Sequence, residues 1–165
     1  MEIKSHKNFA EINVGAISFF CDPSDDFLAE VDNKNVILLS NPSLDLNYNR
    51  IFNAAGEYNV DDVYFWGFNN KKNIAYLLEY KKNFLFYCNG GVAQETIKHI
   101  KAFYKNIDVL LLGKDNTDKE IIAALKPKII FSFRNIEVNK FTKEKISKVK
   151  LNFKKVENVL YIFSS

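Results

Sequence analysis

Residues 108–133, DVLLLGKDNTDKEIIAALKPKIIFSF, contain two apolar runs separated by a short amphipathic segment. The runs at 109–112 and 129–133 have the length of strands, and uninterrupted apolar character is typical of strands that are covered on both faces. Between them, residues 119–125 follow Asn116-Thr117-Asp118, which predicts a helix cap, and stop before Pro127. The order strand, helix, strand predicts an α/β domain in which helices cover a sheet.

Apolar and turn-forming residues on both sides of this stretch extend the same pattern. Residues 93–104 carry apolar side chains at helical spacing, which predicts a second helix. The lysine-rich residues 142–149 predict a short basic helix. Strands are predicted at residues 9–14, 16–21, 36–39, 63–68, 74–80, 83–87 and 158–163.

Length and composition predict one globular domain over residues 1–165. The chain has 47% hydrophobic residues and shows no internal repeat, low-complexity stretch or Pro/Gly-rich linker. A core of ordinary size can form in a chain of this length. These features exclude a disordered or fibrous protein.

The net charge of +3 is too small to indicate a nucleic-acid-binding protein by itself. The charge is nevertheless uneven. Residues 1–60 hold four Lys/Arg against nine Asp/Glu, a net charge of −5, whereas residues 61–165 have a net charge of +8. An acidic first part and a basic second part permit head-to-tail self-association or an acidic partner, although lysines also commonly cover solvated surfaces.

Cysteine usage and the beginning of the sequence indicate a reduced, cytoplasmic protein. Cys21 and Cys88 do not have the spacing of a metal motif. The first ten residues carry charges and lack the apolar segment of a secretory signal. No apolar run approaches the roughly 20 residues that span a bilayer, so no membrane partner is expected.

A series of short motifs occurs in a fixed order along the chain and resembles a known family. The motifs are Ser5-His6-Lys7-Asn8-Phe9, Asp22-Pro23, residues 40–46 (SNPSLDL), Gly56-Glu57-Tyr58-Asn59, Cys88-Asn89-Gly90-Gly91, and Lys126-Pro127-Lys128 before a strand and Arg134. In order and flanking strands, the series resembles the small metallo-β-lactamase-fold hydrolases of the lactonase-like branch. The resemblance covers residues 5–135. It implies a compact, truncated four-layer αββα sandwich.

The family's chemistry requires two divalent metals, usually zinc, held by histidine and aspartate side chains. The resemblance maps these ligands onto positions where only Asp45 is of the expected kind, while Cys88 can ligate as a thiolate. Arg134 places a permanent cation where a metal should bind. We therefore expect no metal, no other cofactor and no catalytic residue. The remnant of the family's pocket is expected to consist of His6, Asn41, Ser43, Asp45, Leu46, Cys88, Gly91 and Arg134.

The leading prediction is a catalytically inactive relative, a pseudoenzyme with a binding or assembly role. Its partner is expected to be another protein, a second copy of the chain, or a small anionic ligand near Arg134. Arg134 is predicted either to pair with Asp45 in place of the metal or to be an ordinary surface residue. His6 is expected to be a hydrogen-bonded turn residue, and Asp22 to form a local turn hydrogen bond.

Two alternatives remain open at this point. A divergent hydrolase requires a rebuilt site, such as Cys88 with His6 within hydrogen-bond reach, or a single metal at Asp45. A nucleic-acid-binding protein requires the lysines of residues 126–155 to form one continuous basic C-terminal face. Glu137 and Glu144 interrupt this run, and Glu157 follows it.

Overall fold

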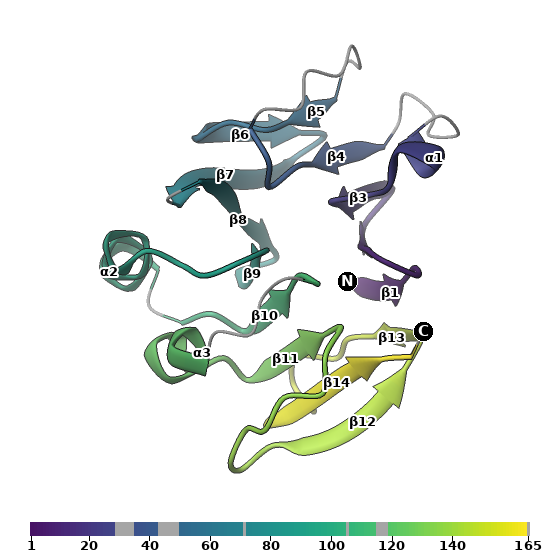
Figure 1. Ribbon diagram of the computed structural model, residues 1–165, viewed down its shortest axis with the longest axis vertical. Helices are drawn as coiled ribbons and strands as arrows, with labels where there is room; N and C mark the ends of the chain where they lie inside the picture. The colour runs from purple at the N-terminus through teal and green to yellow at the C-terminus, as the bar shows by residue number, and fades with distance from the viewer. Residues whose placement is uncertain (29–34, 43–49, 71, 105, 115–118, 165) are drawn as a thin grey trace.

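The computed structural model describes residues 1–28, 35–42, 50–70, 72–104, 106–114 and 119–164. Two mixed β-sheets face each other as a sandwich (Figure 1). The six-stranded sheet, called the first sheet below, has the strand order β13 (Lys148–Lys150), β1 (Glu2–Ser5), β2 (Ala10–Val14), β3 (Ile17–Cys21), β4 (Val36–Leu38), β5 (Ile51–Phe52). The predicted strands at 9–14 and 16–21 are confirmed as β2 and β3, which pair as an antiparallel hairpin, and Gly15 forms its turn with a φ of +63°.

The second sheet has eight strands. Its order is β12 (Thr142–Ile146), β14 (Val159–Phe163), β11 (Ile129–Ser132), β10 (Val109–Leu112), β9 (Asn83–Cys88), β8 (Asn73–Tyr80), β7 (Val63–Asn70), β6 (Gly56–Val60). In this spatial order, neighbouring strands from β12 through β9 pair in parallel. Neighbouring strands from β9 through β6 pair antiparallel. The predicted strands at 63–68, 74–80, 83–87, 109–112, 129–133 and 158–163 are confirmed within a residue or two at their ends.

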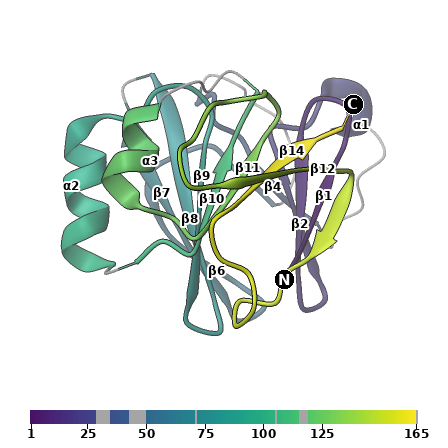
Figure 2. The same cartoon turned by 90° about the horizontal axis from the view of Figure 1, so that it is seen from below.

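Both longer helices, α2 (Gln94–Phe103) and α3 (Lys119–Leu125), lie on the outer face of the second sheet (Figure 2). Their buried residues confirm the two helices predicted around residues 93–104 and 119–125. The predicted cap at residues 116–118 lies outside the described residues. On the first sheet's side the described residues contribute one four-residue helix, α1 (Asp25–Leu28), so the two-sheet α/β architecture is confirmed but a full fourth layer is not shown.

The apolar strands contribute side chains to two hydrophobic cores, one on each face of the second sheet. In β10, Val109 and Leu111 pack between the two sheets, whereas Leu110 and Leu112 pack beneath the helices, and all four are fully buried. Because successive side chains of a strand point to opposite faces, a strand between two layers must be apolar at every position. Among the described residues, every helix is too short or too polar to traverse a lipid bilayer.

The predicted basic helix at 142–149 is wrong, because this segment forms strands β12 and β13. Strand β12 pairs with β14 of the second sheet, and after Ser147 the chain continues as β13 along β1 of the first sheet. Val149 packs toward the core between two exposed lysines, Lys148 and Lys150. This period of two is typical of an edge strand, where exposed lysines are common. The chain therefore closes one side of the sandwich by passing from one sheet to the other.

The opposite side of the sandwich is closed in the same way between β5 and β6. The carbonyl oxygen of Ala54, in this connection, accepts a hydrogen bond of 3.0 Å from the Tyr58 hydroxyl. The same oxygen lies so near Gly67 of β7 that a Cβ atom there would approach it to 2.3 Å. Glycine at position 67 is therefore required by the close approach of two backbones.

Candidate functional site

The predicted remnant pocket divides into residues that the structure describes and residues that it does not. Ser43, Asp45 and Leu46 lie outside the described residues, so the Arg134–Asp45 pair stays a prediction. The other five predicted residues are His6, Asn41, Cys88, Gly91 and Arg134.

Cys88 and His6 lie in different layers of the molecule. Cys88 is the last residue of β9 and is fully buried in the core beneath the helices, in one cluster with Val92 and Ile97. His6 follows β1, where its Nε2 atom lies 2.8 Å from a carboxylate oxygen of Glu11 and its ring stacks on Phe9. Glu11 alternates in β2 with residues of the inter-sheet core, so its side chain is on the outer face of the first sheet.

His6 is part of a polar network on that outer face. Glu11 is nearly buried and also receives hydrogen bonds from Lys4 at 3.0 Å and Asn13 at 2.7 Å. Burial alone would raise the pKa of the Glu11 carboxyl, but the bonds from His6, Lys4 and Asn13 outweigh burial and lower its pKa. This arrangement agrees with the prediction of a hydrogen-bonded histidine.

Asp22 has its carboxylate at these strand ends, although the sequence did not single it out as a site residue. One of its oxygens accepts the backbone N–H of Ser40 at 2.6 Å. The other accepts the Tyr87 hydroxyl and, at 3.0 Å, the side-chain amide of Asn89. Asp22 follows β3 in the first sheet, whereas Tyr87 and Asn89 lie at the end of β9 in the second. The expectation of a merely local turn bond is therefore corrected: Asp22 links the two sheets.

Tyr76 makes a second link between the sheets. Its hydroxyl, from β8, lies 2.7 Å from the carbonyl oxygen of Leu39 and 2.5 Å from that of Phe52, both in the first sheet's half. Burial, followed by the negative charge of Asp22, raises the pKa of the Tyr76 phenol. The same two causes raise the pKa of the fully buried Tyr87.

Asparagine side chains hold the segment that follows β9. The Asn70 amide donates to the carbonyl oxygen of Gly91 at 2.7 Å, and its own oxygen accepts the N–H of Ala93 just before α2. The Asn73 amide donates to the carbonyl oxygen of Asn89 at 2.8 Å. Gly91, one of the predicted pocket residues, is thus fixed by its backbone.

Arg134 and Asn41 are both exposed. The turn after β11 is held by Ser132, whose hydroxyl donates to the carbonyl oxygen of Arg134 at 2.8 Å and accepts its N–H at 3.1 Å. A cavity of about 110 Å³ lies near this end of the sandwich, lined by His6, Lys7, Lys114, Phe133, Phe163 and Ser164. A cavity of this size is smaller than typical small-molecule sites.

The described side chains at these strand ends do not fit a dinuclear metal centre. In the part of the chain that the structure describes, no three His, Cys, Asp or Glu residues are grouped as metal ligands. The Asp22 carboxylate, which follows β3, already accepts hydrogen bonds from three N–H or O–H groups. A catalytic zinc needs about three protein ligands.

Comparison with solved structures identifies the fold of this chain. A Thermotoga maritima protein described as a Zn-dependent hydrolase of the metallo-β-lactamase superfamily superposes with a TM-score of 0.72, covering 99% of this chain and 100% of the other at 17% identity. A mutant of the CmlA β-hydroxylase matches with a TM-score of 0.57 at 7% identity, covering 79% of this chain and 45% of the other. No protein-family model matches the sequence, and no curated protein matches it.

The chain has the metallo-β-lactamase fold, and the resemblance seen in its ordered motifs is confirmed at the level of the fold. The match extends over the whole chain, including β12 and β13, beyond the residues that carried the sequence resemblance. At these identities, the comparison establishes architecture and leaves the chemistry to the site itself.

Proposed function

We propose that this chain is a metallo-β-lactamase-like protein that has lost hydrolytic activity and acts by binding or assembly. The observation that carries the proposal is the bonding of Asp22. Its carboxylate accepts hydrogen bonds from Ser40, Tyr87 and Asn89 and so acts as a structural link beside positions 41 and 88, to which the resemblance maps metal ligands.

Three of the positions that the resemblance maps to metal ligands point in the same direction. The Cys88 thiol faces the helix-covered core, and Gly91 has no side chain to offer a metal. Arg134 is a permanent cation, which disfavours a nearby metal ion. The proposal for Asp45, Ser43 and Leu46 rests on the sequence alone.

Elemental analysis of protein purified without chelator tests the proposal. We expect zinc, iron and manganese far below one equivalent per chain, and no uptake when zinc is added and then removed by gel filtration. One or two equivalents of retained metal would overturn the proposal. In that case Asp45→Ala and Asp22→Asn, compared with the exposed Asp62→Asn, identify which carboxylate holds the metal.

The assembly role is tested separately by sedimentation velocity at low and high salt. The uneven charge, −5 over residues 1–60 and +8 over the remainder, predicts self-association that weakens as salt screens it. A monomer at all concentrations and salt levels removes self-association and leaves binding of a different partner as the proposed role.

A further inference from the structure

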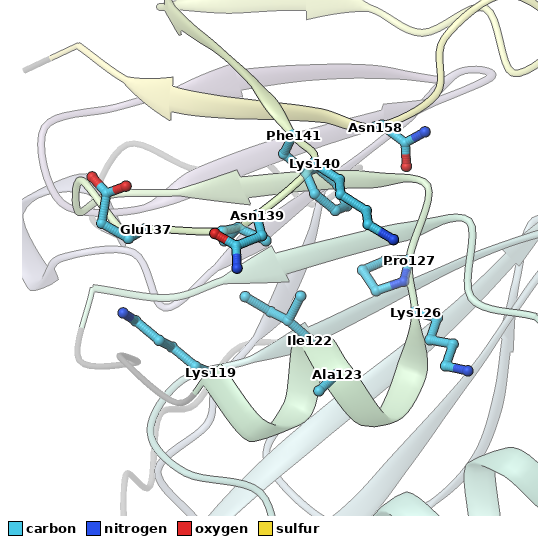
Figure 3. A pocket seen from close by; sticks show the side chains of 11 residues that line it. Lys119, Ile122, Ala123, Lys126, Pro127, Glu137, Asn139, Lys140, Phe141 and Asn158 are labelled. Atoms are coloured by element: carbon cyan, nitrogen blue, oxygen red, sulfur yellow. The ribbon is translucent and has the colours of Figure 1, made fainter.

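A second cavity lies on the helix-covered side of the second sheet, away from the strand ends described above. It has a volume of about 680 Å³ and is bounded by α3, the loop before β12, and the residues that precede β11 and β14 (Figure 3). Because Pro127 and Asn158 precede parallel strands, this cavity is at the amino ends of those strands, opposite Arg134. The volume is within the range of small-molecule sites.

The middle of this cavity is apolar. Ile122 and Ala123 project into it from α3, and Pro127 and Phe141 lie across from them (Figure 3). Ile122 and Pro127 are buried, while the Phe141 ring is half-buried. An apolar patch of this kind favours a ligand with a hydrocarbon or aromatic body.

The rim of the cavity is cationic. Lys126 and Lys140 are exposed, and neither makes an ion pair with any residue that the structure describes. Glu137, the acid among the described lining residues, is paired with Lys143 at 2.6 Å, and its carboxylate points away from the cavity in Figure 3. In contrast, other lysines, such as Lys4 and Lys128, do pair with carboxylates. The two rim lysines are therefore available to an anion.

The two rim lysines lie in tight turns with a left-handed backbone. Lys126 and Lys140 have φ angles of +48° and +70°, and Asn158 on the same rim has +57°. In this left-handed region, glycine and asparagine are favoured over lysine. Lys81 and Lys82, in a hairpin turn outside this cavity, have similar φ angles, so the proposal rests on the charge and shape of the cavity and the backbone supplies matched variants for its test.

We propose that this cavity binds a small organic anion. Its phosphate or carboxylate group lies at the rim formed by Lys126, Lys140 and Asn158, and its aromatic or aliphatic body covers Ile122 and Phe141. The proposal goes beyond the loss of hydrolysis and holds whether or not the opposite edge of the sheet is catalytic.

Titration of the full chain with 1-naphthyl phosphate, followed by calorimetry and by amide shifts in NMR spectra, tests this proposal. We expect saturable binding, with shifts concentrated in α3 and residues 137–141. Lys126→Asn and Lys140→Asn should each weaken binding about tenfold, the effect of losing one charge-assisted hydrogen bond. The matched control is Lys82→Asn, an exposed lysine in a hairpin turn with a φ of +64° that does not line this cavity.

The thermal midpoint separates loss of a ligand contact from loss of the fold. Because asparagine suits a left-handed residue, all three variants should melt at the same temperature as the parent chain or higher. Weaker binding in the two cavity variants alone, at an undiminished melting temperature, supports the proposal.

Several results would overturn it. One is the absence of saturable binding of both 1-naphthyl phosphate and 1-naphthoate at millimolar concentration. A loss in Lys82→Asn equal to that in the cavity variants would show unspecific attraction to lysines. Equal affinity for uncharged 1-naphthol would show that the rim does not recognise charge, and equal affinity for inorganic phosphate would show that the apolar middle contributes nothing.

Discussion

The hydroxyl of Tyr87, near the end of β9 in the second sheet, donates a hydrogen bond to the carboxylate of Asp22, which follows β3 in the first sheet. The sequence does not predict this contact, because 65 positions separate Tyr87 from Asp22. Together with the Asn89 side chain and the Ser40 N–H, it fastens the two sheets to each other at these strand ends.

The first prediction concerns this link. Asp22→Asn retains a residue that tolerates the left-handed backbone but replaces one acceptor oxygen by an N–H₂ donor, which leaves a donor without its partner. We expect a loss of about 2 to 3 kcal/mol in the free energy of unfolding, measured by urea denaturation. The matched control is Asp62→Asn, also left-handed and exposed, which should change stability by less than about 0.5 kcal/mol. Equal effects of the two variants would contradict the structural role of Asp22.

The second prediction concerns alkaline pH. Burial and the charge of Asp22 raise the pKa of Tyr76 and Tyr87 above that of an unfolded tyrosine, about 10. A group whose pKa is raised in the folded state contributes stability that is complete below the unfolded pKa and is lost as the pH rises above it. Stability should therefore fall steeply above a pH of about 10.

The phenolate absorbance, followed together with circular dichroism, checks this expectation. The buried tyrosines should ionise only as the chain unfolds, after the exposed ones. Tyr87→Phe should reduce the steepness of the alkaline loss, whereas Tyr64→Phe, at an exposed position, should leave it unchanged. Ionisation of all tyrosines before any change in circular dichroism would contradict the assignment.

The third prediction concerns the two thiols. Cys21 and Cys88 are 1% and 0% exposed, and burial, followed by Asp22, raises the pKa of the Cys21 thiol. Because the thiolate is the reactive form, neither cysteine should react with a thiol reagent in the folded protein, and both should react in denaturant. Rapid labelling of Cys88 in the native protein, identified in a Cys21→Ala background, would revive the alternative of a rebuilt nucleophilic site.

The fourth prediction concerns the backbone contact at Gly67. A methyl group there would lie 2.3 Å from the carbonyl oxygen of Ala54, so β7 or the connection between β5 and β6 must move. Gly67→Ala should cost about 2 to 3 kcal/mol in chemical denaturation. Gly15→Asn is the control, because position 15 has open space around it and a φ that asparagine accepts. A loss below about 1 kcal/mol for Gly67→Ala would show that the two backbones are not held together here.

The parts of the fold that the sequence predicts well are those fixed by local pattern. Strand β10 is apolar throughout and α2 repeats its apolar residues at helical spacing, so both follow from short windows of sequence. Strands β1 and β6 escaped prediction, and the edge strands β12 and β13 were mistaken for a helix. All four carry few apolar residues, and β12 and β13 become strands because β14 and β1, from other parts of the chain, offer them an open edge.

The same distinction applies to the candidate site. The resemblance located the end of β9 and the turn after β11, where Gly91 and Arg134 lie. It did not reveal that Cys88 faces the helices, because that depends on which residue of β9 meets the inter-sheet core. Nor did it identify the links of Asp22, whose partners come from a different sheet. The Asp22-Pro23 motif was the one signal available, and it predicts a turn without naming a partner.

The passage of residues 142–150 from the second sheet to the first affects how this protein is made. Strand β1 is flanked by β2 on one side and by β13 on the other, and β13 lies nearly 150 residues later. On the ribosome, the outer edge of β1 therefore remains open until residues 148–150 have emerged. An open strand edge is a template for pairing with other chains, so the nascent protein should aggregate more readily than the finished one. Lys4 on β1 places a charge on that edge strand, the kind of feature that limits such pairing during synthesis.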